Sequence, residues 1–543
     1  MNGSAARRRN GAGRHPHLVT RALGVTAALA LALSACTSGG GATEPDEDSS
    51  AIDDAAVSGE PREGGELIIG ADADPIGLDP VLTNAFSSYD FMDLIYSGLL
   101  RWTPDMEIEP DLAVSYENPD PTTYIFTLRE GVMFHNGQSF SADDVKYTFD
   151  RILDPDEGSP RLSEFENIDA VEVIDPTTVK FTLKGPDAAF LAFMATKPNS
   201  AIVPQGVDGL VDNPVGTGPF AFESYAPNQE LRLVANEDYY EEGLPYLDAV
   251  TFRFFGDQAS LVSALRSNAV HMTWLKDPKV AATVAGDGSG LVSAPGQTSR
   301  TFPVWFNVSV VPFDDVRVRQ ALSLAIDRES ILNTVLAGSG EIAGRIPSSQ
   351  VGGYVGDGSD LPNYTQDVDA AKELLADAGY PDGIDLGEYK VVAANDLDVQ
   401  AAQLLQEQWA AAGISVDLNP METAPLLDDW AKGNFGMLSV ALSWTSDPDA
   451  ILGRIRSTSS YGAAMGMSDT ELDAMMTAAR AELDPDARAE INLEIQQRIA
   501  ENAYVLDIYG YPLRWEMWAE SVHGYEAMAA NSRAYVRTTW IEE

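Results

Sequence analysis

The sequence predicts an α/β protein whose folded body begins near residue 64. Segments with the alternating pattern of strands and segments with helical periodicity follow one another along the whole body. Hydrophobic residues make up 45% of the chain and aromatic residues 9%, which suits an ample core. About 480 residues remain after the N-terminal region, more than one hydrophobic core usually serves. We therefore expect two or three lobes.

Residues 1–35 have the pattern of a secretory signal that ends before Cys36, the only cysteine of the chain. Arginines come first, an uncharged run over residues 22–35 follows, and small residues precede the cysteine. The run is too short to span a bilayer comfortably. An ordinary signal peptide with an incidental cysteine is the alternative, but a lone cysteine has little other use in an exported protein. Residues 33–36, Leu-Ser-Ala-Cys, resemble a bacterial lipobox, which implies that Cys36 is acylated and becomes the new N-terminus.

Residues 36–63 are expected to form a disordered acidic tether. The segment is rich in Gly, Ser, Ala, Asp and Glu and has almost no large apolar side chains. Burial therefore cannot offset the entropy of ordering it. A spacer between membrane and body and an unselected tail both predict disorder here.

The first half of the body predicts strands joined to helices. Residues 66–70 form an apolar strand, residues 123–128 alternate as a half-buried strand, and residues 171–183 read as a hairpin that turns at Asp175. Residues 88–99 have a helical pattern, and a further helix begins near Asp187. Ser141 is a suitable N-cap for a helix whose first turn carries two aspartates.

The second half becomes more helical. Strands are expected over residues 231–235, 250–255, 390–393, 415–418 and 436–442, and helices over residues 257–267, 314–336, 367–378, 399–412, 423–432, 468–481 and 484–501. An aromatic run over residues 504–518 closes the body.

The net charge of −48 becomes more negative once the arginines of the signal are removed. This charge excludes a general nucleic-acid binder, which needs basic surface to meet phosphate. It also opposes a body that lies flat on anionic lipid. Steering of cationic ligands and solubility in a saline habitat are both compatible with such acidity.

Several blocks in order resemble the solute-binding proteins, family 5, of peptide-type ABC importers. The longest is YIFTLREGVMFHNG at residues 124–137, which runs into residues 140–151. The other blocks are residues 96–100, 109–113, 213–220, 236–240, 306–307, 313–322 and 370–380. Within them, Gly216 and Gly218 suit a tight backbone passage at the start of a strand or at a crossing between lobes. The resemblance covers residue 64 to the C-terminus.

The resemblance implies a type II, cluster C periplasmic-binding-protein fold of three lobes, with a ligand cleft between lobes I and III. It implies an extracytoplasmic protein, lipid-anchored to the outer face of the cell membrane, that works as a monomer with an ABC permease and its ATPase subunits. The expected lobes are residues 64–107, 206–299 and 505–543 for lobe I, residues 108–205 for lobe II and residues 300–504 for lobe III.

The best ligand-site candidate is the segment 443–449, which follows the expected strand 436–442. In the family an acidic residue of this region meets the α-ammonium of a bound peptide, which points to Asp447 first and Asp449 second. A buried ammonium needs a paired charge, and Trp444 is suited to an apolar wall or a cation–π contact. The alternative is that these aspartates cap the helix that follows.

The chain departs from the dipeptide binders of the family, which carry an arginine for the peptide carboxylate in a segment that corresponds to residues 391–399. No arginine occurs there. Arg345, beside an expected cleft loop, is a substitute, and a surface arginine is the alternative. The family also binds longer peptides, opines, oligosaccharides and nickel complexes.

Other classes of protein have weaker support. The mature chain keeps His135, His271 and His523 in no metal-ligand spacing, and it lacks the Gly-x-Ser-x-Gly motif of hydrolases. We therefore expect no catalysis, no cofactor and no metal. A secreted hydrolase is the less favoured alternative, and a lipid-anchored sensor of a peptide signal is an alternative that the sequence does not separate from an importer.

Overall fold

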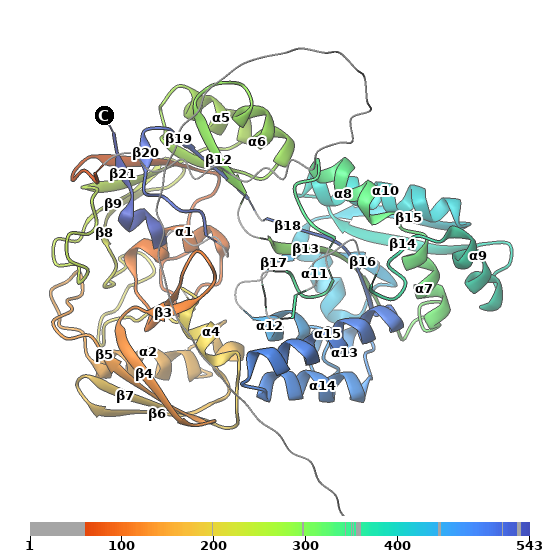
Figure 1. Cartoon of the computed structure of the whole chain (residues 1–543), viewed down its shortest axis with the longest axis horizontal. Helices are drawn as coiled ribbons and strands as arrows, with labels where there is room; N and C mark the ends of the chain where they lie inside the picture. Colours follow the sequence, from red (N-terminus) through yellow and green to blue (C-terminus); the bar gives the residue numbers. More distant parts are fainter. Residues whose placement is uncertain are drawn as a thin grey trace, which may run out of the picture. The chain divides into compact units, whose positions relative to one another are not determined.

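The computed structural model describes residues 60–542, apart from residues 198, 296–297, 343, 349, 351, 354–359, 444–446, 513 and 529–533. The described residues belong to one unit of the chain that spans Val57–Glu543. The predicted signal, Cys36, most of the predicted tether and Trp444 lie outside the described residues. Within them the chain is a mixture of helices and strands, so the α/β class is confirmed (Figure 1).

A seven-stranded sheet collects strands from distant parts of the chain. Its order is β12 (Leu291–Pro295), β19 (Trp515–Ala519), β11 (Met272–Leu275), β1 (Glu66–Ala71), β10 (Ala249–Phe254), β9 (Glu230–Ala235) and β8 (Phe220–Ala226). Three helices pack against this sheet: α1 (Phe86–Ile95), α5 (Gln258–Arg266) and α6 (Pro278–Ala285). Asp257 and Asp277 cap α5 and α6, because each carboxylate accepts hydrogen bonds from backbone N–H groups of the first turn.

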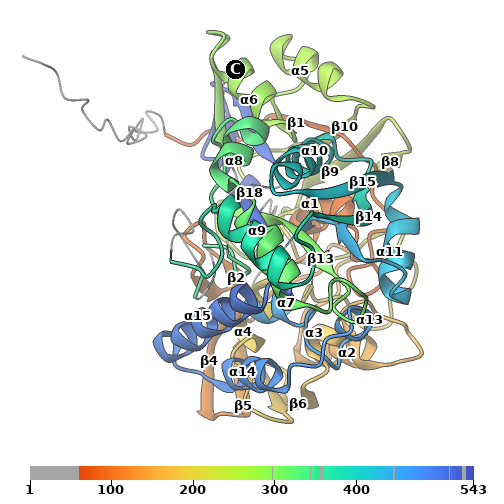
Figure 2. The same ribbon diagram turned by 90° about the vertical axis from the view of Figure 1, so that its right-hand side faces the viewer.

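A six-stranded sheet forms from the second half of the chain. Its order is β15 (Ile414–Met421), β14 (Ile384–Val392), β16 (Met437–Ser439), β13 (Thr298–Phe306) and β17 (Leu442–Ser443), and β18 (Val505–Pro512) also pairs with β13. The helices of this part are α7 (Val316–Leu324), α8 (Arg328–Leu336), α9 (Val368–Asp377), α10 (Asp396–Ala411), α11 (Thr423–Lys432), α12 (Pro448–Leu452), α13 (Ser460–Ala464), α14 (Thr470–Ala481) and α15 (Pro485–Asn502). Helices α14 and α15 lie side by side in both views (Figure 2).

A four-stranded antiparallel sheet has the order β4 (Ala113–Asp120), β5 (Thr123–Leu128), β7 (Thr178–Leu183) and β6 (Ile168–Asp175). Helix α2 (Ala142–Leu153) packs on it, next to α3 (Leu162–Phe165) and α4 (Phe190–Ala195). Smaller elements are β2 (Leu100–Trp102), β3 (Ile108–Pro110), β20 (Val522–His523), β21 (Trp540–Ile541) and the 3-10 helix η2 (Ala534–Thr538). Ser141 is the N-cap of α2, as the sequence predicts, and it forms a complete capping box with Asp144.

Two expectations about elements are wrong. The expected helix 314–336 is two helices, because Asp327 accepts a hydrogen bond from the N–H of Ser330 and starts α8 there. The expected strand 436–442 is divided into β16 and β17, which pair with different parts of β13. In both places a continuous apolar pattern concealed a local break in the backbone.

The chain also returns to the seven-stranded sheet later than expected. Strand β18 pairs with β13 in the six-stranded sheet, whereas β19 pairs with β11 and β12 in the seven-stranded sheet. Residues 505–512, which the sequence analysis assigns to lobe I, thus form a strand of the six-stranded sheet. Strand β18 is buried along its whole length, so its apolar sequence does not reveal which sheet it joins. The division into three lobes itself stays a prediction.

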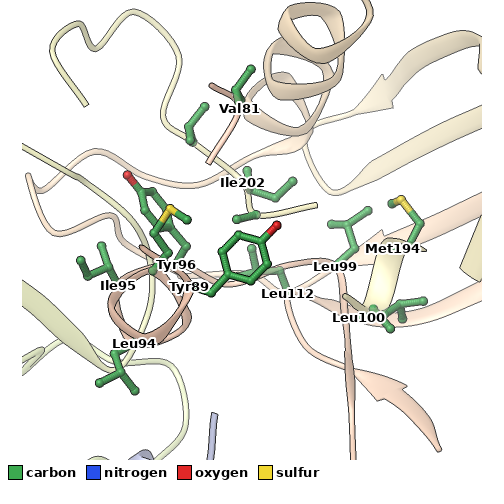
Figure 3. Close-up of a cluster of buried hydrophobic side chains, with 14 of the residues drawn as sticks. Val81, Tyr89, Leu94, Ile95, Tyr96, Leu99, Leu100, Leu112, Met194 and Ile202 are labelled. Atoms are coloured by element: carbon green, nitrogen blue, oxygen red, sulfur yellow. The ribbon is translucent and has the colours of Figure 1, made fainter. Parts of the chain in front are cut away.

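The largest hydrophobic cluster surrounds α1. Leu94, Ile95, Tyr96 and Leu99 are fully buried in this cluster. Met194 of α4 lies beside them (Figure 3). The hydroxyl of Tyr96 donates a hydrogen bond to the backbone carbonyl of Leu78 at 3.0 Å. The cluster therefore joins the seven-stranded sheet to the segment that leads into the four-stranded sheet.

A tight backbone passage holds His135 against the start of β8. A Cβ atom at Gly216 or Gly218 would collide with the backbone of Leu94 and Ile95, which confirms the predicted close approach. His135 Nε2 lies 3.0 Å from the carbonyl oxygen of Gly218, and the N–H of Gly216 donates to Nδ1 at 3.4 Å. The ring is therefore neutral, with its proton on Nε2. Burial lowers the pKa of His135 to about 4, and the hydrogen bond with Gly218 raises it by a smaller amount.

This depressed pKa predicts a loss of stability in mild acid. The unfolded chain takes up a proton near pH 6.5 and the folded chain only near pH 4, so stability falls as the pH drops from 6.5 to 4. At pH 5 the contribution of His135 is a loss of about 2 kcal/mol. Urea unfolding at pH 7 and pH 5 should show this loss in the wild type and a smaller one in His135→Gln, whose amide can still donate to Gly218. Equal losses in both proteins would contradict the assignment.

Candidate functional site

Two cavities lie where the sheets meet. The Asp447 cavity has a volume of about 700 Å³, and the aromatic side chains of Trp102, Tyr116 and Tyr124 form part of its wall. Asp447 and Arg488 contribute to the opposite part, next to the turn between α14 and α15. The wall thus combines residues of the four-stranded region with residues of α12 and α15.

The Arg300 cavity has a volume of about 380 Å³. Gln258, Lys276 and Asp277 line it from the α5 and α6 region of the seven-stranded sheet. Arg300, Tyr511 and the start of α10 line it from the six-stranded sheet. This cavity therefore lies between the bodies built on the two large sheets.

Asp447 is held inside the protein by Arg488. The two nitrogens Nη1 and Nη2 of Arg488 donate to the two carboxylate oxygens at 2.7 and 2.6 Å, and both side chains are buried. The carboxylate also accepts a hydrogen bond from the N–H of Asp449 at 2.9 Å and so caps α12. Burial would lower the pKa of Arg488, but the bonds to Asp447 and its charge outweigh burial and raise it.

The capping role that the sequence left open for these aspartates is thus present at Asp447. Its role as the partner of a ligand ammonium stays a prediction. Both oxygens are already engaged, so an ammonium would have to share them with Arg488.

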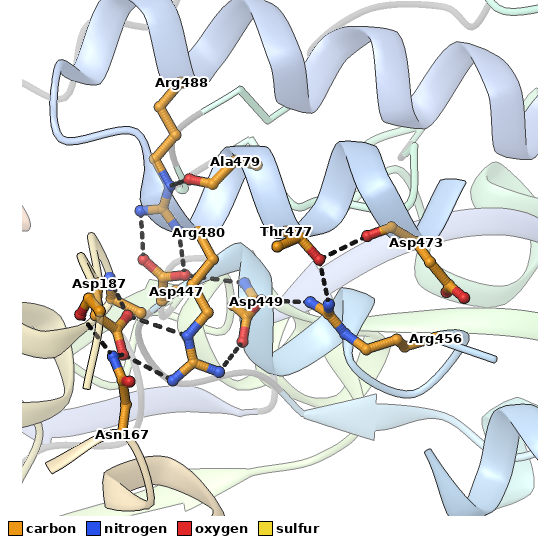
Figure 4. A network of polar contacts seen from close by, with 12 residues as sticks. Asn167, Asp187, Asp447, Asp449, Arg456, Asp473, Thr477, Ala479, Arg480 and Arg488 are labelled. Carbon is orange, nitrogen blue, oxygen red and sulfur yellow. Dashed lines mark hydrogen bonds and ion pairs between the residues drawn. The ribbon is translucent and has the colours of Figure 1, made fainter. Parts of the chain in front are cut away.

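Asp449 belongs to a network that joins two parts of the fold (Figure 4). Arg480 Nη1 donates to Asp449 at 3.0 Å. The same guanidinium also binds Asp187, through Nη2 at 2.7 Å and Nε at 3.2 Å. Arg456 reaches Asp449 at 3.2 Å. Burial raises the pKa of Asp449, and the charge of Arg480 opposes that rise. The network ties α12 and α14 to Asp187, which precedes α4.

The role of Arg345 at the ligand stays a prediction, but Arg345 is not the surface arginine that was the alternative. It is 1% exposed, and its Nη1 donates to Asp507 at 2.7 Å. The guanidinium also lies over the ring of Trp305 at 4.6 Å. Arg345 lines neither of the two cavities. The sequence cannot reveal this burial, because Asp507 lies far along the chain.

The two ends of the predicted ligand segment lie beside different cavities. Ser443 in β17 pairs with Arg300 of β13 across the sheet, so the segment starts beside the Arg300 cavity. Asp447 and Pro448 then line the Asp447 cavity. Trp444 lies outside the described residues, so its predicted role is untested.

Sequence reasoning missed the cluster around Arg300. The Nη2 of Arg300 lies 3.4 Å from an oxygen of Asp398, and the guanidinium stacks over the ring of Tyr511 at 5.6 Å. The hydroxyl of Tyr511 donates to the other oxygen of Asp398 at 3.3 Å. Burial raises the pKa of Asp398, and the charge of Arg300 acts in the opposite direction. No local motif marks these three residues, because β13, α10 and β18 bring them together.

The described residues contain neither a cluster suited to a metal ion nor a helix suited to span a membrane. Within the described residues, no three His, Cys, Asp or Glu side chains come together in a way that could hold a metal ion. In the same part of the chain, no helix is both long and apolar enough to cross a membrane.

Comparison with known proteins identifies relatives over most of the chain. The oligopeptide-binding protein AppA of Bacillus subtilis (strain 168) is 27% identical over 549 residues, which cover 96% of this chain and 98% of AppA. The glutathione-binding protein GsiB of Salmonella paratyphi A is 31% identical over 365 residues, which cover 66% of this chain and 70% of GsiB.

Solved structures of similar proteins have the same fold as this chain. The ABC transporter-associated periplasmic binding protein DppA from Helicobacter pylori, in complex with the peptide STSA, superposes with a TM-score of 0.75 at 25% identity. The alignment covers 89% of this chain and 99% of DppA. AppA of Bacillus subtilis in complex with a nonapeptide gives a TM-score of 0.73 at 26% identity, over 89% of this chain and all of AppA. The predicted cluster C fold is thus confirmed.

Residues 107–463 match the family described as bacterial extracellular solute-binding proteins, family 5. The members of this family are non-catalytic substrate-binding proteins of ABC transporters, so the expectation that the chain is not an enzyme is also confirmed. The chain belongs to the bacterial extracellular solute-binding proteins of family 5.

Proposed function

We propose that this protein captures a peptide-like solute outside the cell and delivers it to the permease of an ABC importer. The observation that carries the proposal is the Arg300 cavity, which has residues of both large sheets in its wall. Spaces between lobes are the usual place for a small-ligand site. The match to AppA, an oligopeptide-binding protein, over 96% of the chain supports a peptide as the solute.

We propose that binding occurs by closure of the bodies built on the two large sheets around the solute. The chain passes between these sheets twice, from β12 to β13 and from β18 to β19, and closure of two bodies around a ligand is a common movement. A solute that contacts both bodies stabilises the closed arrangement by its differential affinity for it. The permease and its ATPase subunits then receive the loaded, monomeric protein.

A thermal-shift screen tests the function with the mature protein, from residue 36 onward. The panel contains alanine peptides of two to nine residues, glutathione, an opine and haem. A ligand that binds only the folded state raises the unfolding midpoint in a concentration-dependent way. We expect a rise with peptides of one length range. Stabilisation by glutathione, the opine or haem alone would replace the peptide by that class of solute, and no response to any compound would overturn the proposal.

We further propose that a lipid on Cys36 holds the protein at the outer face of the membrane. The position of this lone cysteine directly after the apolar run supports the anchor. Cells that express Cys36→Ser should release the protein from the membrane fraction, and metabolic labelling with a fatty acid should be lost. Unchanged retention of the variant in the membrane fraction would overturn the anchor.

A further inference from the structure

Arg300 occupies a special place in the fold. It lies near the start of β13, the first strand after the chain enters the six-stranded sheet. Its backbone pairs with Ser443 on one side and Tyr511 on the other. The side chain therefore stands beside the start of the segment 443–449 and in the wall of the Arg300 cavity.

The guanidinium of Arg300 has hydrogen-bonding capacity to spare. A guanidinium carries five N–H donors, and the described contact to Asp398 uses Nη2 at the long distance of 3.4 Å. Its Nε is buried and has no hydrogen-bond partner among the residues that the structure describes. The side chain keeps 20% of its surface exposed, whereas that of Asp398 keeps 1%. Asp398 thus fixes the guanidinium from inside, and part of it remains open to the cavity.

The other charged groups of the cavity are already engaged or lie toward solvent. Asp277 uses its carboxylate to cap α6 by accepting from the N–H groups of Lys279 and Val280. Lys276 pairs with Asp72 and is 62% exposed. Asp396 lies in the first turn of α10, where the helix dipole favours a negative charge. Arg300 is consequently the cation of this wall that is both partly enclosed and positioned by the sheet.

We propose that Arg300 binds a carboxylate of the solute and that the protein therefore selects acids over their neutral analogues. An arginine recognises a planar carboxylate through two parallel N–H···O bonds. The carboxylate would supply the acceptors that the guanidinium lacks, and Asp398 and Tyr511 would hold the guanidinium in place. The inference rests on the proposed binding of a peptide-like solute and adds the chemical group that is recognised.

Titration calorimetry with matched pairs of ligands tests this. The alanine peptide with the largest thermal shift is compared with its C-terminal amide on wild type, Arg300→Met and Arg300→Lys. We expect the wild type to prefer the acid by about 30-fold, as for a charge-assisted bond in an enclosed site. Arg300→Met should bind acid and amide equally, at the affinity of the amide, and Arg300→Lys should keep part of the preference. Arg266→Met, which changes an exposed arginine of α5, is the control and should behave as wild type.

A second variant separates a loss of carboxylate binding from a loss of the fold. Arg300→Met leaves Asp398 buried without a counter-charge, so Arg300→Met combined with Asp398→Asn removes both charges at nearly constant shape. A full acid preference in either variant overturns the assignment of Arg300 while the proposed function stands. A wild type that binds no peptide of the panel overturns the proposed function and this inference together.

Discussion

Asp447→Ala is expected to lower the free energy of unfolding by about 3–5 kcal/mol, because it leaves the buried charge of Arg488 without its partner. The bidentate contacts at 2.6 and 2.7 Å and the cap of α12 are lost together. A carboxylate that served only to meet a ligand in an open cleft would contribute little to folding. Urea unfolding of the ligand-free protein, followed by tryptophan fluorescence, measures the difference.

Asp428→Ala is a matched control for this variant. Asp428 also pairs with a cation, Lys432, at 2.6 Å, but these side chains are 58% and 60% exposed. An exposed pair is worth less than about 1 kcal/mol, so the control should remain close to wild type. A loss as small as this in Asp447→Ala would show that the pair with Arg488 is not maintained in solution. In that case Asp447 would be a free carboxylate in the cavity wall.

Arg480→Ala is expected to cost about 2–3 kcal/mol of stability, since Asp187 is buried and loses a bidentate partner. The loss is smaller than at Asp447, because Asn167 and the N–H of Ala189 continue to donate to Asp187. The N–H of Ala188 donates to the carbonyl of Arg480 at 2.8 Å. Native-state hydrogen exchange should therefore speed up at the amide of Ala188 in the variant.

Arg456→Ala separates this contact from a general effect of removing an arginine. Arg456 and Arg480 are both 22% exposed and both bind Asp449, but only Arg480 also binds Asp187. Arg456→Ala should thus cost less than about 1 kcal/mol and leave exchange at Ala188 unchanged. Equal losses in the two variants would mean that the contact to Asp187 adds nothing to stability.

The sequence predicts local structure well where the chemistry is local. The capping box at Ser141 and the N-cap aspartates of α5, α9 and α14 act within their own first turns, so they can be recognised from neighbouring residues. The division of the expected helix 314–336 at Asp327 is a case where the same chemistry was present but hidden in a long apolar pattern.

The candidate site was predicted less well, because its charges find partners through tertiary contacts. Asp447, in the segment that the sequence proposes, lies in the wall of a cavity, yet the sequence cannot show that Arg488 binds Asp447 and that Arg480 binds Asp449. Arg345 and Arg300 illustrate the same limit in opposite directions. The first is buried against Asp507, and the second, unremarkable in sequence, lines the cavity between the two large sheets.

The two connections between the large sheets run side by side, because the strands before and after them are paired with each other. The ladder of β12 and β19 finishes at Pro295 and Trp515, and the ladder of β13 and β18 begins at Thr298 and Pro512. Two residues separate the ladders on each connection, so the connections have equal length. Because β12 is paired with β19 and β13 with β18, each pair of strands moves as one unit with the body that contains it.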